Sequence, residues 1–194
     1  MIALLAIGQS GPAGKAQGPD PIVVMQTTKG TIVMRIFLGL CPQNASSFLD
    51  LVSHGFYNGL TFHRVEGWVI QGGDPRGNGT GNFVDPQTGQ TRYLRLETNR
   101  NLRHNGPGVV AMAHSRSPNS ASCQFYITKK AAPALDGQYS IFGGVVQGMD
   151  VVYNISIGDR ILSARVIDRS DNRPGGPPPG PAPQPGPQET DSGF

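Results

Sequence analysis

Short apolar runs alternate with turn residues along most of this chain. Two runs, at positions 22–28 and 31–38, flank the dipeptide Lys29-Gly30, which is typical of a β-hairpin. Further runs occur at 60–65, 67–72, 94–97, 107–113, 123–128, 141–146 and 161–168, separated by Gly, Pro and Asn. These lengths suit strands better than helices. The pattern therefore predicts a mainly β domain.

Two segments have the apolar spacing of a helix instead. In residues 44–54, Phe48, Leu51 and Val52 fall on one face, with an Asn at the first position as the expected cap and a Gly after the last. A second helix is predicted at 148–155. Many short strands with two helices favour a closed antiparallel β-barrel capped by two α-helices, because closure removes exposed strand edges.

The two ends of the chain differ in composition from the middle. Residues 1–20 hold a short apolar run and a Gly/Pro-containing linker. The run is short for a signal peptide and lacks basic residues before it. An unstructured start and the remnant of an export signal are both open, and we favour the second, with a periplasmic rather than cytoplasmic location. Residues 171–194 are rich in Pro and Gly, which predicts a disordered spacer, with a polyproline II ligand as the alternative. The folded domain is expected at 21–170.

Charge and composition narrow the possible partners. The 194 residues carry a net charge of +3, and Lys and Arg never form a run longer than two. A nucleic-acid-binding surface is therefore not expected. No stretch is long enough to span a membrane, so stable membrane insertion is not expected either. We expect a monomer.

Nothing in the sequence indicates a nucleophile, metal or cofactor. Cys41 and Cys123 do not form a disulfide framework, and Cys123 in an apolar strand is interpreted as a buried residue rather than a catalytic thiol. The four histidines lack metal-site spacing. The glycines of residues 77–81 superficially resemble a phosphate loop, but no Gly-Lys-Ser/Thr follows. We read this segment as a turn.

The most informative polar residues are one arginine and two glutamines. Arg64 and Gln71 are seven residues apart in an aromatic-rich, β-like setting, and Gln124 lies between apolar residues further along the chain. For a lone strand arginine, a surface ion pair is the default interpretation. Here the pair Gly72-Gly73 allows close backbone approach beside Gln71. This setting favours a binding or catalytic role for Arg64.

Such residues suit the isomerisation of an X–Pro peptide bond. Amide resonance opposes rotation with a barrier of about 18–20 kcal/mol. A catalyst must favour the twisted amide, in which the nitrogen lone pair is no longer shared with the carbonyl. A guanidinium can donate to the prolyl nitrogen or hold the proline's carbonyl, and it stays charged with a rigid set of donors. Such stabilisation is electrostatic catalysis by differential binding.

Residues 22–168 resemble the cyclophilins, a family of peptidyl-prolyl cis-trans isomerases, and the loop before Gln124 is similar to that of bacterial members. The motifs that carry the resemblance are Phe62-His63-Arg64, Gln71-Gly72-Gly73-Asp74, Gly77-Asn78-Gly79-Thr80-Gly81, His104-Asn105-Gly106-Pro107-Gly108, Gln124-Phe125-Tyr126-Ile127 and Leu135-Asp136-Gly137-Gln138-Tyr139. The resemblance implies a closed eight-stranded antiparallel β-barrel with two capping α-helices. It also implies a rotamase that assists protein folding, acts on proline-containing polypeptides and needs no cofactor.

The resemblance also implies roles for single residues. Arg64 and Gln71 would be catalytic, and His63 would support the strand beside Arg64. The substrate-binding residues would be Trp68, Val69, Tyr126 and Leu135 around the proline, Ala113 and the backbone of His114 along the peptide groove, with Gln124 and Tyr139 touching the substrate.

Departures from the family pattern leave an alternative open. The segment from Arg64 to Gln71 is one residue shorter than in most members, and Val69 replaces a common methionine. Ala134 stands where a tryptophan that helps to bind cyclosporin is frequent, so weak sensitivity to that drug is expected. The alternative is a catalytically weak, cyclophilin-like module or chaperone that binds proline-containing peptides.

Overall fold

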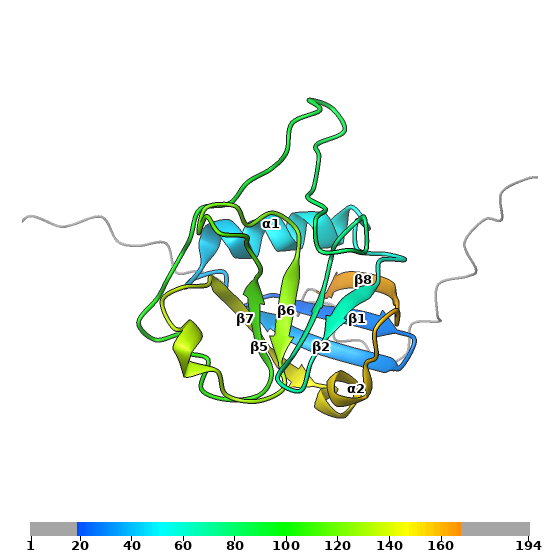
Figure 1. Ribbon diagram of the computed structural model, residues 1–194, viewed down its shortest axis with the longest axis vertical. Coiled ribbons are helices and arrows are strands. Elements are labelled where there is room, and N and C mark those ends of the chain that lie inside the picture. The colour runs from blue at the N-terminus through cyan, green and yellow to red at the C-terminus, as the bar shows by residue number, and fades with distance from the viewer. Residues whose placement is uncertain (1–18, 168–194) are drawn as a thin grey trace, which may run out of the picture.

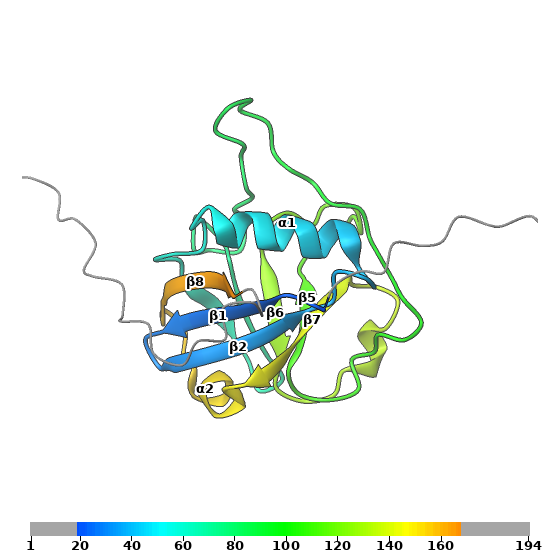
Figure 2. The same cartoon turned by 180° about the vertical axis from the view of Figure 1, so that it is seen from behind.

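The computed structural model describes residues 19–167, and it is mainly β with two α-helices (Figures 1 and 2). The strands are β1 (Ile22–Thr27), β2 (Gly30–Ile36), β3 (Phe62–Val65), β4 (Val69–Gly72), β5 (Val109–Met112), β6 (Phe125–Thr128), β7 (Ile141–Gln147) and β8 (Ile161–Ile167). The helices are α1 (Pro42–Ser53) and α2 (Met149–Asn154), with a 3₁₀ turn at Pro133–Leu135. The expectations for the apolar start and the proline-rich tail fall almost entirely outside the described residues.

The eight strands form one antiparallel sheet in the order β3-β4-β6-β5-β7-β2-β1-β8. The sheet curls into a half-barrel, with α1 along one side and α2 at the opposite end (Figures 1 and 2). No strand ladder joins β3 to β8 within residues 19–167, so the predicted closed barrel is seen only as this curled sheet. The two sheet ends are nevertheless linked by backbone hydrogen bonds from Phe62 N to Asp159 O (2.9 Å) and from Ile161 N to Leu60 O (2.8 Å).

The predicted run at 94–97 is not a strand, and its glutamate has another task. Only Leu94 forms an isolated bridge, with Ala121. The Glu97 carboxylate accepts hydrogen bonds from the backbone N–H groups of Gln43 (3.1 Å) and Asn44 (2.8 Å). It thereby caps the N-terminus of α1, where unpaired N–H groups favour an anion. The helix begins at Pro42, so the expected cap Asn44 lies inside it.

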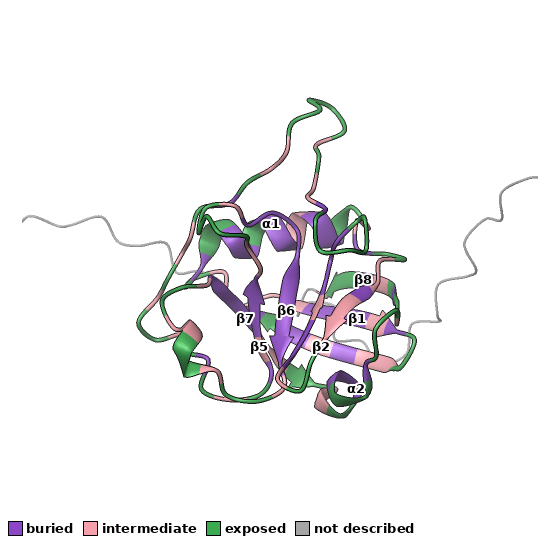
Figure 3. Cartoon of the chain, viewed as in Figure 1, coloured by how far each residue is buried: buried purple, intermediate pink, exposed green. Residues whose placement is uncertain are grey.

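Large side chains from the strands and α1 fill the half-barrel. The Phe48 ring packs 4.8 Å from Phe142 and 5.1 Å from Tyr57, measured between ring centroids. Leu51 and Val52 are buried on the same side of α1, as the spacing predicted. Figure 3 shows this buried layer along the strands and the facing side of the helix. The packing leaves the opposite surface of β3, β4 and β6 available for the polar residues.

A long connection, residues 73–108, joins β4 to β5, and part of it extends beyond α1 as the green loop at the top of Figure 1. An isolated bridge pairs Val84 with Thr91 in this loop. Arg92 ties its base to α1, because its Nη1 lies 2.6 Å from Asp50 Oδ2 and its guanidinium lies 4.5 Å from the Phe83 ring. Within residues 19–167, neither helix has the length and apolarity needed to cross a membrane.

Candidate active site

Arg64 reaches the outer surface of the sheet because β3 contains a bulge. Phe62 pairs with Gly72 and Arg64 pairs with Gln71, which leaves His63 as an extra residue. A bulge of this kind redirects the side chains that follow it. Phe62 is fully buried in the core, whereas the Arg64 side chain is 43% exposed. Arg64 and Gln71 therefore lie on the same outer face, and Arg64 Nη1 donates to Gln71 Oε1 at 3.2 Å.

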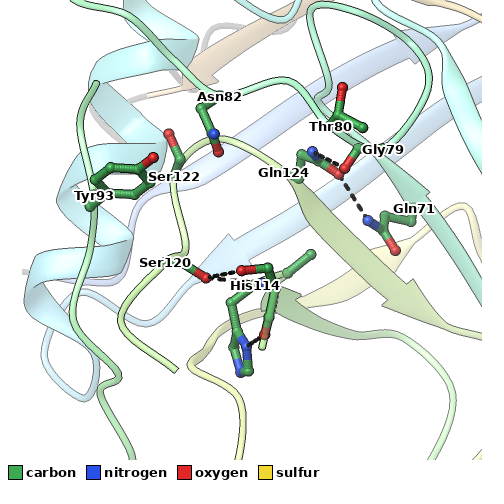
Figure 4. A pocket seen from close by; sticks show the side chains of 11 residues that line it. Gln71, Gly79, Thr80, Asn82, Tyr93, His114, Ser120, Ser122 and Gln124 are labelled. Carbon is green, nitrogen blue, oxygen red and sulfur yellow. Dashed lines mark hydrogen bonds between the residues drawn. The ribbon is translucent and has the colours of Figure 1, made fainter. Parts of the chain in front are cut away.

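Three polar side chains form a hydrogen-bond chain that runs in one direction. Arg64 donates to Gln71. Gln71 Nε2 donates to Gln124 Oε1 at 2.9 Å, as Figure 4 shows. Gln124 Nε2 in turn donates to the carbonyl oxygens of Gly79 (3.1 Å) and Gly81 (2.8 Å). Because these carbonyls can only accept, the orientation of both glutamine amides is fixed. The chain links β3, β4 and the segment before β6 to one loop.

Asp74 shapes the loop on which this chain ends. Its carboxylate accepts hydrogen bonds from the backbone N–H groups of Arg76 (2.7 Å), Asn78 (3.0 Å) and Gly79. Burial raises the pKa of Asp74, but these N–H groups outweigh it and hold the pKa below its usual value. A side chain at Gly81 would collide with the Asp74 carboxylate. The glycines of this segment thus serve a tight turn, as the sequence predicted.

Arg64 stands at the mouth of a cavity of about 400 Å³, here called the Arg64 cavity. It is lined by His63, Arg64, Trp68, Gln71, Asn78, Gly79, Ala113, His114, Tyr126, Leu135 and Tyr139. Most of the predicted site residues meet here. Val69 does not line it, because it is fully buried behind Tyr126, together with Ala111 and Ile141.

The wall formed by Tyr126 is held from behind by a buried histidine. His104 Nε2 lies 2.8 Å from the Tyr126 hydroxyl, and His104 Nδ1 lies 3.1 Å from Asp136 Oδ1. Burial lowers the pKa of His104, and the backbone N–H of His104 contributes most to lowering the pKa of Asp136. The ring is therefore neutral, with Nδ1–H donating to the carboxylate and the Tyr126 hydroxyl donating to Nε2.

A stacked pair of rings forms another side of the cavity. His114 stacks on Tyr139 with ring centroids 4.3 Å apart, and Tyr139 meets Tyr126 edge-on at 5.6 Å. The His114 nitrogens contact the carbonyl oxygens of Ser115 (2.7 Å) and Gln138 (2.8 Å). His114 thus contributes its ring as well as the backbone that the sequence suggested.

A second cavity, here called the Tyr93 cavity, continues from the first and has a volume of about 370 Å³ (Figure 4). The two cavities share Gln71, Gly79, Ala113 and His114. Further lining residues are Thr80, Asn82, Tyr93, Ser115, Ser120, Ser122 and Gln124. Of these, only Gln124 was predicted from the sequence as a site residue. Together the cavities form an extended groove that is suited to a peptide.

Comparison with known proteins agrees with this geometry. The family model for cyclophilin type peptidyl-prolyl cis-trans isomerases matches residues 22–171. The chain belongs to the cyclophilin family. It is 35% identical to the Arabidopsis thaliana peptidyl-prolyl cis-trans isomerase CYP18-2 over 144 residues, which cover 72% of this chain and 83% of the relative. It is 39% identical to ppi1 of Schizosaccharomyces pombe over 133 residues, covering 66% and 81%.

A solved structure supports the same assignment. A Cryptosporidium parvum cyclophilin-type isomerase, whose crystal structure was obtained in the presence of the dipeptide Ala-Pro, superposes with a TM-score of 0.69 at 29% identity. The match covers 76% of this chain and 99% of that one. These three relatives are eukaryotic and do not support the expected likeness to bacterial cyclophilins.

The β3–β4 hairpin of this cyclophilin carries a carboxylate beside Arg64. Glu66 Oε1 accepts from Arg64 Nε at 2.7 Å, and Glu66 Oε2 accepts from Trp68 Nε1 at 2.7 Å. The Arg64 guanidinium also lies 5.4 Å from the centre of the Trp68 ring. These contacts lower the pKa of Glu66, with the hydrogen bond from Arg64 as the largest cause. The short segment between Arg64 and Gln71 was visible in the sequence, but a role for Glu66 was not predicted from it.

His63 has an unusual environment for a polar residue. Both ring nitrogens are buried, and they have no hydrogen-bond partner among residues 19–167. Burial lowers the pKa of His63, and this outweighs the effect of the neighbouring Asp74 carboxylate, which raises it. The ring is therefore neutral near pH 7. A neutral, packed ring suits support of the strand beside Arg64.

Other expectations concern the two cysteines and possible metal ligands. Cys41 and Cys123 are buried free thiols, and Cys123 lies just before β6 rather than within it. Burial raises the pKa of Cys123 to about 12 and raises that of Cys41 further. Thiolates are therefore scarce at neutral pH. Within residues 19–167, no three His, Cys, Asp or Glu side chains gather as a metal site.

His104 and Asp136 are the supporting residues that sequence reasoning missed. Both occur in motifs that carry the family resemblance, so their positions were visible. Their joint role was not, because 32 residues separate them and only the fold brings them together.

Proposed function

We propose that this cyclophilin isomerises X–Pro peptide bonds in polypeptides and so assists protein folding, with Arg64 as the catalytic cation. The observation that carries the proposal is the position of the guanidinium. It lies at the mouth of the Arg64 cavity and is oriented by Gln71, with further N–H donors free for a substrate. A cation held there can stabilise the twisted amide more than either planar form, which lowers the rotational barrier.

The rest of the groove fits the residues on the two sides of the X–Pro bond that rotates. We assign the ring of the proline to the apolar surfaces of Trp68, Tyr126 and Leu135 in the Arg64 cavity. Ala113 lines both cavities and leaves room for the backbone of the preceding residue. The Ala-Pro dipeptide named for the Cryptosporidium parvum relative supports this class of ligand.

Gln71 and Gln124 would act on the substrate backbone. Their amides are oriented by the one-way hydrogen-bond chain that ends on Gly79 and Gly81. Preorganised donors and acceptors need no reorientation when the twisted amide forms, which is the main advantage of a fixed polar site. Rotation about the peptide bond transfers no proton, so a neutral His63 is compatible with the reaction.

A binding module that holds proline-containing peptides without useful turnover is the second candidate. The short hairpin with Glu66 bound to Arg64 favours it, because a carboxylate occupies one edge of the guanidinium. An exchange measurement by NMR, or a protease-coupled assay on a tetrapeptide containing Ala-Pro, separates the candidates. Catalysed cis–trans exchange supports the enzyme, whereas binding at the groove without faster exchange supports the module.

We also propose three structural properties of the working protein. The backbone hydrogen bonds between 59–62 and 158–161 support closure of the sheet into a barrel. The family match to residues 22–171 supports a domain at about 21–170. A monomer is proposed because the groove is built within one chain. Sedimentation equilibrium at increasing concentration tests the last point, and a stable dimer would contradict it.

A further inference from the structure

We propose that Glu66 is the positioning residue for Arg64, holding the guanidinium in one orientation at the mouth of the Arg64 cavity. The inference rests on the proposed isomerase function. Glu66 uses its two carboxylate oxygens for two different partners, Arg64 Nε and Trp68 Nε1, each at 2.7 Å. The carboxylate therefore joins the cation to an aromatic side chain that lines the same cavity.

The short hairpin brings these groups together. Glu66 and Val69 face each other across a two-residue turn, with Glu66 N donating to Val69 O at 2.9 Å. Trp68 lies within that turn, and Arg64 is two residues before Glu66 on β3. All three side chains arise from one hairpin of six residues, 64–69, so their contacts with one another are local in the sequence.

Counting donors shows what Glu66 leaves free. A guanidinium has five N–H groups in a fixed planar fork. One is used at Nε by Glu66 and one at Nη1 by Gln71. The three remaining N–H groups belong to Nη1 and Nη2. Holding Nε therefore fixes the plane of the fork while leaving its outer edge for the substrate. Glu66 is not itself placed in contact with the substrate.

The Glu66 carboxylate also partly neutralises the positive charge of Arg64. This effect should lower the rate, whereas positioning should raise it. Both side chains are more than 40% exposed, so water and salt reduce the charge effect. The orientation of the Arg64 guanidinium is set by direct contacts, which salt does not screen. A small misplacement of a catalytic group has a large effect on rate. We therefore expect the loss of positioning to outweigh the gain in net charge.

The test is the activity of Glu66→Gln measured by NMR exchange on a tetrapeptide containing Ala-Pro. We expect kcat/KM to fall about fivefold, equal to about 1 kcal/mol, with most of the change in kcat. Glu66→Asp keeps the charge but is too short to hold both partners, so an intermediate loss is expected. Asp150→Asn, the same charge change at an exposed position in α2, should leave activity unchanged.

A double variant and a pH profile separate positioning from general damage. In the Arg64→Ala background, Glu66→Gln should cause no further loss, because the group it positions is gone. The activity of the unmodified protein should fall as the pH drops through the Glu66 pKa, which lies below the ordinary value of 4.5, and this fall should be missing in Glu66→Gln. Equal losses in both backgrounds would overturn the inference, as would unchanged or higher activity of Glu66→Gln.

A readout without catalysis distinguishes failure of this inference from failure of the proposed function. The Arg64 Nε–H signal in a ¹⁵N NMR spectrum should be slow to exchange with water in the unmodified protein and fast in Glu66→Gln. If the unmodified protein shows no isomerase activity, the proposed function fails while this signal still reports the contact. If exchange is the same in both proteins, the positioning role is wrong whatever the activity.

Discussion

One wall of the Arg64 cavity, the β3–β4 hairpin, holds its key side chain by contacts at the protein surface, whereas the neighbouring wall on β6 holds Tyr126 by buried contacts. Arg64 is fixed by Glu66 and Gln71 and remains 43% exposed. Tyr126 is 4% exposed, and its partner His104 is fully buried. The exposed wall can be altered with little effect on folding, but the buried wall cannot. Catalysis and stability should therefore respond differently to substitutions on the two sides.

The largest effect on catalysis is expected at the exposed wall. Arg64→Ala should lower kcat/KM by about 10²–10³, the usual result of removing one preorganised donor, with little change in melting temperature. Peptide binding should fall less than turnover, because the cation acts mainly on the twisted amide. Arg64→Lys should not restore full activity, since an ammonium lacks the planar fork. Unchanged turnover in Arg64→Ala, measured by NMR exchange, would refute the mechanism.

The buried wall should respond mainly in stability. His104→Ala removes the partner of the Tyr126 hydroxyl and of Asp136, so the free energy of unfolding should fall by about 1–3 kcal/mol or more. Urea denaturation measures this change. Tyr126→Phe is the comparison, because it removes only the hydrogen bond to His104 Nε2 and keeps the contact between His104 and Asp136, so it should cost less. A variant of His104 that kept full stability but lost activity would reverse the contrast between the walls.

Acid should weaken the buried wall through the same histidine. The pKa of folded His104 lies below 6.5, its value in the unfolded chain, because burial disfavours the charged ring. Below pH 6.5 the unfolded chain therefore binds a proton that the folded protein does not. Stability should be constant above that pH for this group and fall as the pH drops from about 7 towards 5. Urea denaturation at several pH values checks the slope, which should flatten in His104→Gln.

Thiol reagents should have almost no effect on either wall. Burial raises the pKa of both cysteines, and the buried Tyr57 hydroxyl donates to the Cys123 carbonyl at 3.0 Å. An alkylating agent applied to the native protein should leave isomerase activity nearly unchanged over the time in which it labels a denatured sample. Rapid inactivation without unfolding would contradict this expectation.

Removal of the chain ends is expected to have the smallest effect. Both walls are complete within residues 63–139, so a chain of residues 20–171 should keep its melting temperature and activity. The full chain is the reference. A rise in activity on removing 172–194 would indicate that the proline-rich segment competes for the groove, and a loss would make that segment part of the site.

Sequence reasoning found the residues whose role depends on local pattern. The motif around Arg64 and Gln71 pointed to a binding or catalytic role, and the two residues are paired on neighbouring strands of one hairpin. It failed where the role depends on contacts across the fold. The run at 94–97 was predicted as a strand from its apolar residues. The sequence did not reveal that Glu97 lies next to the N-terminus of α1 and caps it. Val69 was assigned to the cavity by resemblance. It shares the outer face of β4 with Gln71, but it is completely buried in a cluster with Ala111, Tyr126 and Ile141 that only the fold brings together.

Glu97 also has a consequence for the order of folding during synthesis. Asn44 and Glu97 are 53 residues apart, so the first turn of α1 leaves the ribosome well before the group that completes it. A single short helix without its cap and its packing partners is marginal in water. The helix should therefore become stable only when the following half of the domain has been made and has docked. We expect this protein to acquire its structure late and in one concerted step rather than helix first.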